Sequence, residues 1–229
     1  PRHTHMKRTT ALACLMLLTA CATTPVDPFA DPFEAQDPIR GFNQGVFAFN
    51  LHADRMVIKP VASAYHEVPS WGREGIGNFL SNLSEPANMI NGILQLEPQV
   101  ALTAFWRFTL NTTFGLAGLR DFAKENGLKE NDQNFGETLK HYGAADGAYV
   151  VLPLVGPSSL RDTTGRVVDW FIDPIGWWFT TPESIAQATA EGINTRDEDN
   201  AIIDQFYYKS LEPYVATRSA YMQHQAFKH

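Results

Sequence analysis

The sequence predicts an all-α fold with one short apolar hairpin near residues 147–158. Apolar side chains recur every three or four residues through several segments after residue 38, which is the period of amphipathic helices. Serine, threonine and proline stand where these segments begin, as they do in the first turns of helices. The hairpin is predicted from an uncharged segment that joins β-forming residues to prolines and a glycine. A single helical domain over residues 38–229 is therefore expected.

A secretory leader precedes this domain. Lys7 and Arg8 are followed by apolar residues 11–18 and by the box Leu18-Thr19-Ala20-Cys21, which is the order found in a cleaved signal peptide. The apolar run is too short to span a bilayer, because a spanning helix needs about 20 residues. The box is similar to the lipobox of bacterial lipoproteins. We therefore expect residues 1–20 to be removed and lipid to be attached to Cys21.

The expected mature chain is acidic. Without the leader, 15 Lys and Arg oppose 25 Asp and Glu, a balance that argues against nucleic acid as a partner. The other cysteine, Cys14, lies in the leader, so no disulfide is expected. Acyl chains on Cys21 would anchor the protein firmly, since each buried methylene contributes about 0.8 kcal/mol. Ala22 follows the cysteine where an aspartate would favour the inner membrane, which is similar to the outer-membrane sorting pattern.

Residues 21–37 predict an extended tether, because they are rich in proline and aspartate and lack a hydrophobic period. Asp37 is then a candidate N-cap, with Pro38 in the first turn of a helix. One stripe of that helix contains Ile39, Phe42, Val46, Phe49, Ala53 and Met56, with Phe47 and Leu51 beside it. The apolar face is wider than a single core contact requires.

Prolines and serines divide the next part of the chain. Pro60 and Pro69 are expected to interrupt helices. Ser70 is a candidate cap for a helix over residues 71–83, and Ser84 with Pro86 is expected to start a second helix.

Residues 98–119 contain a single charge, Arg107. The helix that begins at Pro98 is expected to end near residue 113, at about 24 Å, which is short of a hydrocarbon core of about 30 Å. Its periodicity favours a buried central helix of a soluble domain over a helix embedded in the bilayer.

The uncharged hairpin at residues 147–158 needs either the core or a lipid to cover it. Ser158 or Ser159 is expected to cap the following helix. Further on, Trp177 and Trp178 would suit a membrane interface, although burial is the commoner state of tryptophan. Helices are expected from Thr181-Pro182 and from Pro213, and the acidic run 197–199 indicates a solvated helix face.

The motifs of common enzymes are missing from the sequence. We find no Gly-x-Ser-x-Gly, His-Glu-x-x-His, phosphate loop or cysteine nucleophile. His52, His66, His141 and His224 lack the spacing that would bring two of them to one metal. We therefore expect no enzyme, no cofactor and no metal, although a serine, histidine and aspartate could still meet in space.

Several stretches match a known family pattern. They are Asp31-Pro32-Phe33-Glu34, Gly41-Phe-Asn-Gln-Gly-Val-Phe-Ala-Phe-Asn50, Lys59-Pro60-Val61-Ala62, Asn78-Phe-Leu-Ser-Asn-Leu-Ser-Glu-Pro86, Asn111-Thr-Thr-Phe-Gly-Leu-Ala-Gly118, and Tyr149-Val-Val-Leu-Pro-Leu-Val-Gly-Pro-Ser158 followed by Leu160-Arg161-Asp162. With these motifs the chain resembles the VacJ family of outer-membrane lipoproteins, also called MlaA. One departure is Glu212-Pro213-Tyr214, where the family usually has Asp-Pro-Tyr.

The resemblance implies a ring-like arrangement of amphipathic helices around a central channel, within the inner leaflet of the outer membrane. Phospholipids misplaced in the outer leaflet would enter the channel and pass to a soluble periplasmic lipid carrier, and the lipoprotein would associate with trimeric porins. The expected lipid-passage residues are Tyr149, Leu152, Pro153, Leu154, Gly156, Pro157, Leu160, Arg161 and Asp162. The expected membrane-embedded residues are Phe42, Val46, Phe49, Phe105, Trp106, Trp177 and Trp178.

Within this scheme, we hypothesise that Arg161 and Asp162 give the headgroup a polar path beside the hairpin. Two other functional classes stay open: a periplasmic lipid hydrolase and a structural lipoprotein that braces the envelope. A hydrolase would release fatty acid or headgroup from phospholipid, whereas a brace needs no cavity.

Overall fold

The computed structural model describes residues 33–227. The chain divides into two compact units, Pro1–Glu34 and Ala35–His229, and the second unit carries the fold. The expected lipidation site Cys21 and most of the tether lie outside the described residues. Across the described part of the chain, no helix has both the length and the apolar character needed to cross a membrane.

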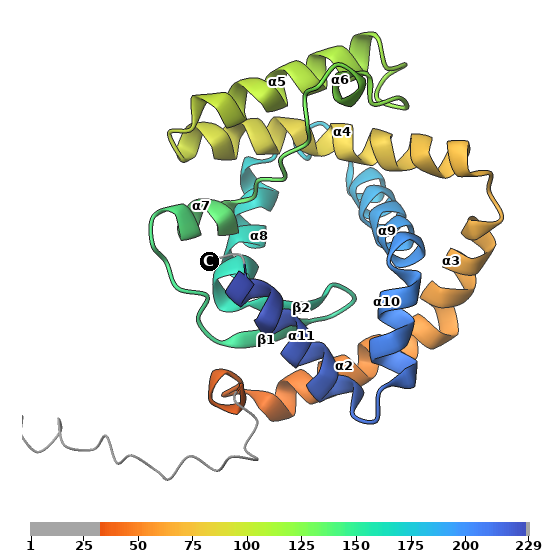
Figure 1. Cartoon of the computed structure of the whole chain (residues 1–229), viewed down its shortest axis with the longest axis vertical. Coiled ribbons are helices and arrows are strands. Elements are labelled where there is room, and N and C mark those ends of the chain that lie inside the picture. Colours follow the sequence, from red (N-terminus) through yellow and green to blue (C-terminus); the bar gives the residue numbers. More distant parts are fainter. Residues whose placement is uncertain (1–32, 228–229) are drawn as a thin grey trace, which may run out of the picture. The chain divides into compact units, whose positions relative to one another are not determined.

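The second unit is helical apart from one hairpin. Its elements are α2 (Arg40–Ala53), a π-helical turn (Asp54–Ile58), α3 (Lys59–His66), α4 (Ser70–Leu94), α5 (Pro98–Thr113), α6 (Phe122–Glu125), α7 (Phe135–His141), β1 (Tyr149–Leu152), β2 (Gly156–Ser159), α8 (Leu160–Ile172), α9 (Thr181–Glu198), α10 (Asn200–Asp204), a second π-helical turn (Gln205–Lys209) and α11 (Pro213–Phe227). Figure 1 shows the ribbon of this unit following a closed circuit, with α5 lying outside α4. The predicted all-α fold and ring-like arrangement are confirmed.

The start of the first long helix differs from the prediction. α2 begins at Arg40, and Asp37 does not cap it. The Asp37 side chain is buried, and its carboxylate accepts hydrogen bonds from Asn43 (2.7 Å), Arg218 (2.6 Å) and Tyr214. Three donors from within the unit therefore outcompete the backbone amides of the helix start.

Pro60 does not end the helix as predicted. The π-helical turn Asp54–Ile58 carries the chain from α2 directly into α3, and Pro60 lies in the first turn of α3. The π-helical turn just before Pro60 already departs from the regular α-helical hydrogen-bond pattern, so the missing proline amide costs less there than inside a regular helix.

The prediction of two helices between Ser70 and Leu94 was wrong. α4 is continuous from Ser70 to Leu94 with Pro86 inside it. An internal proline removes one backbone hydrogen bond and clashes with the preceding turn, so the helix needs support from its neighbours. α5 supplies it, because the two helices pack closely: a Cβ added at Gly92 would lie 2.7 Å from the backbone nitrogen of Ala101.

The predicted hairpin is confirmed. β1 pairs with β2 in antiparallel register from Tyr149 opposite Ser159 to Leu152 opposite Gly156. The turn between them uses left-handed backbone at Leu154 (φ 63°) and Gly156 (φ 93°). Ser159 caps α8, because its hydroxyl accepts a hydrogen bond from the Asp162 amide at 3.0 Å. In Figure 1 the hairpin tip points toward the inside of the circuit.

Candidate functional site

The two faces of α2 are inverted relative to a helix of a water-soluble domain. Asn43, Phe47 and Asn50 are buried, whereas Phe42 is 61% exposed and Phe49 is 54% exposed. The predicted apolar stripe therefore exists, but it faces away from the interior of the unit.

The same inversion recurs across the described residues. The buried polar and charged residues are Asp37, Asn43, Asn50, Asp54, Asn82, Glu85, Asn88, Asn91, Gln95, Arg107, Asn111, Thr138, Ser158, Ser159, Arg161, Arg196, Asp197, Thr217, Arg218 and Gln225. The buried apolar residues are Phe47, Ala62, Leu80, Ala101, Ala104, Ala123, Tyr149, Val151, Tyr214 and Met222. Because burying polar groups costs free energy unless they are paired, an interior with more polar than apolar residues requires extensive hydrogen bonding.

Two asparagines of α2 hold the hairpin. Asn43 donates to the carbonyl of Tyr149 (3.0 Å) and accepts from the amide of Val151 (2.9 Å). Asn50 donates to the carbonyl of Leu152 (2.9 Å) and accepts from the amide of Leu154 (2.7 Å). Sequence reasoning missed both residues. The available signal was their spacing of seven residues, about two helical turns, which puts both on one helix face beside the apolar stripe.

The other side of the hairpin packs on α11. Tyr149 is fully buried, with its ring centre 5.7 Å from that of Tyr221 and 6.4 Å from that of Tyr214. Burial raises the pKa of the Tyr149 hydroxyl well above its usual value. At the tip, Leu154 and Val155 are exposed. The hairpin thus has a polar, fixed base and an apolar, uncovered tip.

Arg161 and Asp162 lie at the base of the hairpin, where their charges are already paired. The Arg161 guanidinium is buried and forms ion pairs with Asp146 and with Asp162 (2.9 Å). The Asp162 carboxylate also accepts from Tyr221 (3.2 Å) and Gln225 (3.1 Å). In this arrangement the two residues tie the start of α8 to α11.

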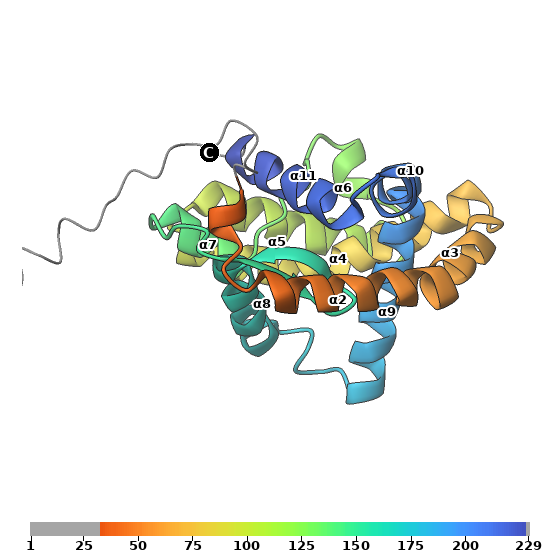
Figure 2. The ribbon, with the colours of Figure 1, turned by 90° about the horizontal axis from the view of Figure 1, so that it is seen from below.

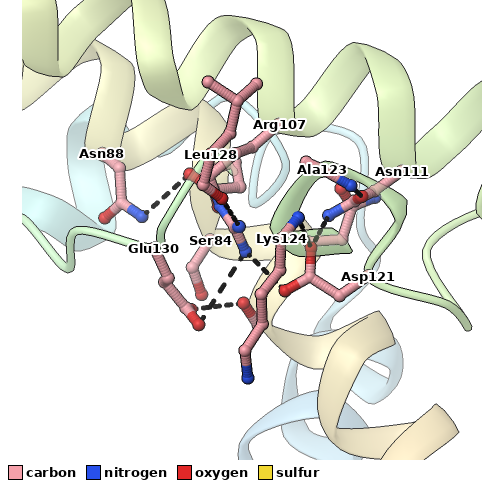
Figure 3. A network of polar contacts seen from close by, with 12 residues as sticks. Ser84, Asn88, Arg107, Asn111, Asp121, Ala123, Lys124, Leu128 and Glu130 are labelled. Atoms are coloured by element: carbon pink, nitrogen blue, oxygen red, sulfur yellow. Dashed lines mark hydrogen bonds and ion pairs between the residues drawn. The ribbon is translucent and has the colours of Figure 1, made fainter. Parts of the chain in front are cut away.

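Buried ion pairs join other helices as well. Figure 3 shows the network around Arg107, whose guanidinium donates to Glu85, to Asp121 (3.1 Å) and to the carbonyl of Leu128 (2.7 Å). Burial raises the pKa of Asp121, but hydrogen bonds from the Lys124 amide, Arg107 and other donors lower it further than burial raises it. This network closes the contact between α4, α5 and the segment after α6.

A second set of pairs joins α2 and α3 to the C-terminal helices. Arg196 of α9 donates to Asp54 (2.7 Å) and to Asp204 (2.6 Å). Asp197 beside it pairs with His66 (2.6 Å) and Arg73. The predicted solvated face at 197–199 was therefore wrong for Asp197, which is buried.

The chain matches a known protein family. The model of the MlaA lipoprotein family matches residues 35–228. The chain belongs to the MlaA lipoprotein family. It is 39% identical over 218 residues to the intermembrane phospholipid transport system lipoprotein MlaA of Escherichia coli K12, covering 92% of this chain and 84% of that protein.

A Haemophilus influenzae protein of the same description is 34% identical over 225 residues, covering 96% of this chain and 88% of its own length. A solved structure from work on the maintenance of bacterial outer membrane lipid asymmetry superposes with a TM-score of 0.72 at 39% identity. That match covers 83% of this chain and 98% of the solved chain.

The apolar residues expected to face the membrane are largely exposed in this MlaA-family chain. Phe105 and Trp106 on α5 are about half exposed, and Trp177 and Trp178 are 69% and 84% exposed. Val46 is half-buried. The periodicity of residues 98–113 predicted a buried central helix, and this prediction was wrong. α5 buries only small or polar residues and Arg107, namely Ala101, Ala104, Arg107 and Asn111, and its large apolar residues point outward.

Two hollows of different character lie along α4 of the MlaA-family unit. One, of about 410 Å³, lies between α4, α9 and residues 130–132, and its lining includes Glu74, Ser81, Glu191 and Asn194. The other, of about 660 Å³, is an apolar groove between α4 and α5 lined by residues such as Met89, Ile93, Leu102 and Phe105. Both volumes are of the size that holds small molecules in proteins, about 300–1,000 Å³.

Proposed function

We propose that this chain is an outer-membrane lipoprotein that removes mislocalised phospholipids from the outer leaflet. In this proposal the circuit of helices lies in the inner leaflet and surrounds an amphipathic channel. A phospholipid enters the channel, passes the hairpin and leaves on the periplasmic side, so that lipid asymmetry is maintained.

One observation carries the proposal: the unit buries polar side chains and exposes apolar ones. Exposed apolar surface is stable against acyl chains, whereas in water it drives association. A phospholipid also needs two environments at once, because its headgroup is polar and its tails are not. In this proposal the paired polar interior and the apolar hairpin tip at Leu154 and Val155 would supply the two environments.

The anchor and the partners extend the proposal. Acylation of Cys21 would hold the chain on the membrane, and the relatives from Escherichia coli and Haemophilus influenzae are described as lipoproteins of an intermembrane phospholipid transport system. A lipid that leaves one membrane needs a carrier to cross water, so we propose a soluble periplasmic lipid carrier as one partner. A trimeric porin, also proposed, would be contacted through the exposed apolar side chains.

The hairpin residues have distinct proposed roles. Arg161 and Asp162, being paired at the base, would hold the hairpin in place through α11. The stretch Leu152, Pro153, Leu154 with Gly156 and Pro157 would form the edge along which the tails slide, with Tyr149 and Leu160 at its ends. The structure thus favours a positioning role for the charged pair over direct contact with a headgroup.

The test is complementation of a strain that lacks this protein, with surface-exposed phospholipid as the readout. We expect Gly156→Asp to fail, because this substitution puts a charged side chain at a φ of 93° in the hairpin turn. Gly143→Asp is the matched control, since Gly143 also has positive φ (85°) and open space around it but lies outside the hairpin. We expect it to restore asymmetry. Equal restoration by both variants at equal protein levels would remove the hairpin from the mechanism.

The proposed function is not enzymatic. Three histidines of the described residues bond to other groups: His52 to the carbonyl of Ala48 (2.8 Å), His66 to Asp197 and His141 to Glu97 (3.4 Å). Purified protein incubated with phospholipid vesicles should therefore release no fatty acid or headgroup. Release that a single Ser→Ala change abolished would replace transport with hydrolysis, and unchanged surface lipid in the deletion strain would favour a structural brace.

A further inference from the structure

Residues 170–179, here called the aromatic loop, comprise the last residues of α8 and most of its connection to α9. The exposed large side chains of the loop are Trp170, Phe171, Trp177 and Trp178, and Asp173 is its one charged residue. Figure 2 shows this connection projecting on one side of the unit, away from α11 and α6. Exposed aromatic residues at this density are typical of a surface that meets a membrane.

Several polar groups of the loop are hydrogen-bonded within the loop. The Asp173 carboxylate accepts from the amides of Ile175 (3.0 Å) and Gly176 (3.2 Å), and the amides of Trp178 and Phe179 donate to the Ile175 carbonyl. The Trp177 indole donates to the carbonyl of Phe171 at 2.9 Å. A tryptophan at a membrane interface normally keeps its N–H for water, so this internal bond frees Trp177 to enter hydrocarbon, where unpaired polar groups are costly.

A charged segment lies on the opposite side of the unit. Residues 124–132, which include the end of α6, contain five charged residues in nine positions, and all but Leu128 are exposed. Figure 2 places α6 and α11 on the side away from the aromatic loop. The aromatic loop and the charged segment 124–132 therefore lie on opposite sides of the circuit of helices.

We propose that residues 170–179 insert more deeply into the acyl region of the bilayer than any other part of the described chain. The charged segment 124–132 then faces the periplasm. This inference rests on the membrane placement in the proposed function and adds its orientation and depth. α9, which starts just after the loop, is about 27 Å long. One leaflet is only half of a hydrocarbon core of about 30 Å. α9 is therefore long enough to carry the loop beyond the leaflet proposed to hold the ring.

The depth can be measured with three labelled sites in the full-length acylated protein. Trp178→Cys probes the loop, Phe105→Cys probes the exposed face of α5, and Lys129→Cys probes the charged side. Each thiol is labelled with a fluorophore and placed in phosphatidylethanolamine and phosphatidylglycerol vesicles. Iodide then quenches labels in water, and nitroxides near the carbonyl or methyl end of the acyl chain quench labels at shallow or deep positions. The acylated parent chain, in which lipid occupies the Cys21 sulfur, gives the background labelling.

We expect the methyl-end nitroxide to quench position 178 more strongly than the carbonyl-end nitroxide does. A label at position 105 should be quenched by both lipid nitroxides, but less by the methyl-end nitroxide than by the carbonyl-end one. A label at position 129 should be quenched by iodide. Trp170→Cys, at the other end of the loop, should repeat the result at 178 and covers the case that Trp178→Cys misfolds. Iodide quenching at 178 and 170 equal to that at 129 would overturn the loop insertion. If 105 were still quenched by lipid, the proposed function would stand, whereas iodide quenching at 105 would remove the membrane placement itself.

Discussion

Replacing Arg107 by methionine should destabilise the unit strongly. The side chains of Arg107 and Glu85 are each 1% exposed, and Arg107 also donates to Asp121 and to the Leu128 carbonyl. Arg107→Met keeps much of the volume but leaves the Glu85 carboxylate buried without its cation. Breaking a buried ion pair in this way costs about 3–5 kcal/mol. Denaturant unfolding of the detergent-solubilised full chain, followed by helical circular dichroism, would measure the loss.

The double variant Arg107→Met with Glu85→Met separates this account from simple loss of packing. With both charges gone, the remaining cost is the hydrogen bonds lost by Leu128, Asp121 and Asn88. Because no buried carboxylate is left without its cation at position 85, the double variant should be more stable than Arg107→Met alone. Arg120→Met is the matched control, because Arg120 pairs with Glu125 at the surface and exposed pairs contribute little. Additive losses in the double variant, or an equal loss at Arg120, would refute the reasoning.

Three further predictions follow from single contacts. Asn43→Ala should lower the free energy of unfolding by about 2–4 kcal/mol, because it leaves the buried Val151 amide and Tyr149 carbonyl unpaired. Hydrogen exchange at the Val151 amide should accelerate. Protection equal to that of the parent would contradict the role of Asn43 in holding the hairpin. Burial raises the pKa of Asp37, but hydrogen bonds from Tyr214 and other donors lower this pKa overall. The ionised Asp37 therefore stabilises the fold above about pH 4, and this stabilisation is lost as the pH falls below that value. Asp37→Asn should flatten the acid limb of a curve of stability against pH. An unchanged acid limb would contradict this role of Asp37. Gly165→Ala should lower the melting temperature, because its Cβ would lie 2.3 Å from a backbone nitrogen of α7, whereas Gly192→Ala on α9 meets nothing within 4 Å and should not.

Local signals in the sequence were sufficient for several elements. Pro98 and the polar run after Leu110 predicted the bounds of α5, and Pro213 predicted the start of α11. Proline and glycine at fixed positions predicted the hairpin, because their backbone limits act without help from the rest of the chain. α4 could not be predicted in this way, since its continuity past Pro86 depends on packing against α5.

The direction in which an apolar stripe faces is a different kind of information. The spacing from Ile39 to Met56 predicted one apolar stripe on α2, and that stripe exists. Periodicity gives the angle between faces but not the medium that each face meets. The buried asparagines of α2 carry that information only when their partners in the hairpin, about a hundred residues later in the chain, are known.

A two-stranded hairpin is an unusual element to place beside lipid, because its backbone edges have no water to bond. Here α2 supplies the missing partners: Asn43 and Asn50 together bond two amides and two carbonyls of the hairpin segment. An amide side chain suits this task, since it both donates and accepts and carries no charge to desolvate. In the proposed function, the hairpin would meet hydrocarbon at its tip while its base stays hydrogen-bonded, and a lipid tail would then move along it without breaking the fold.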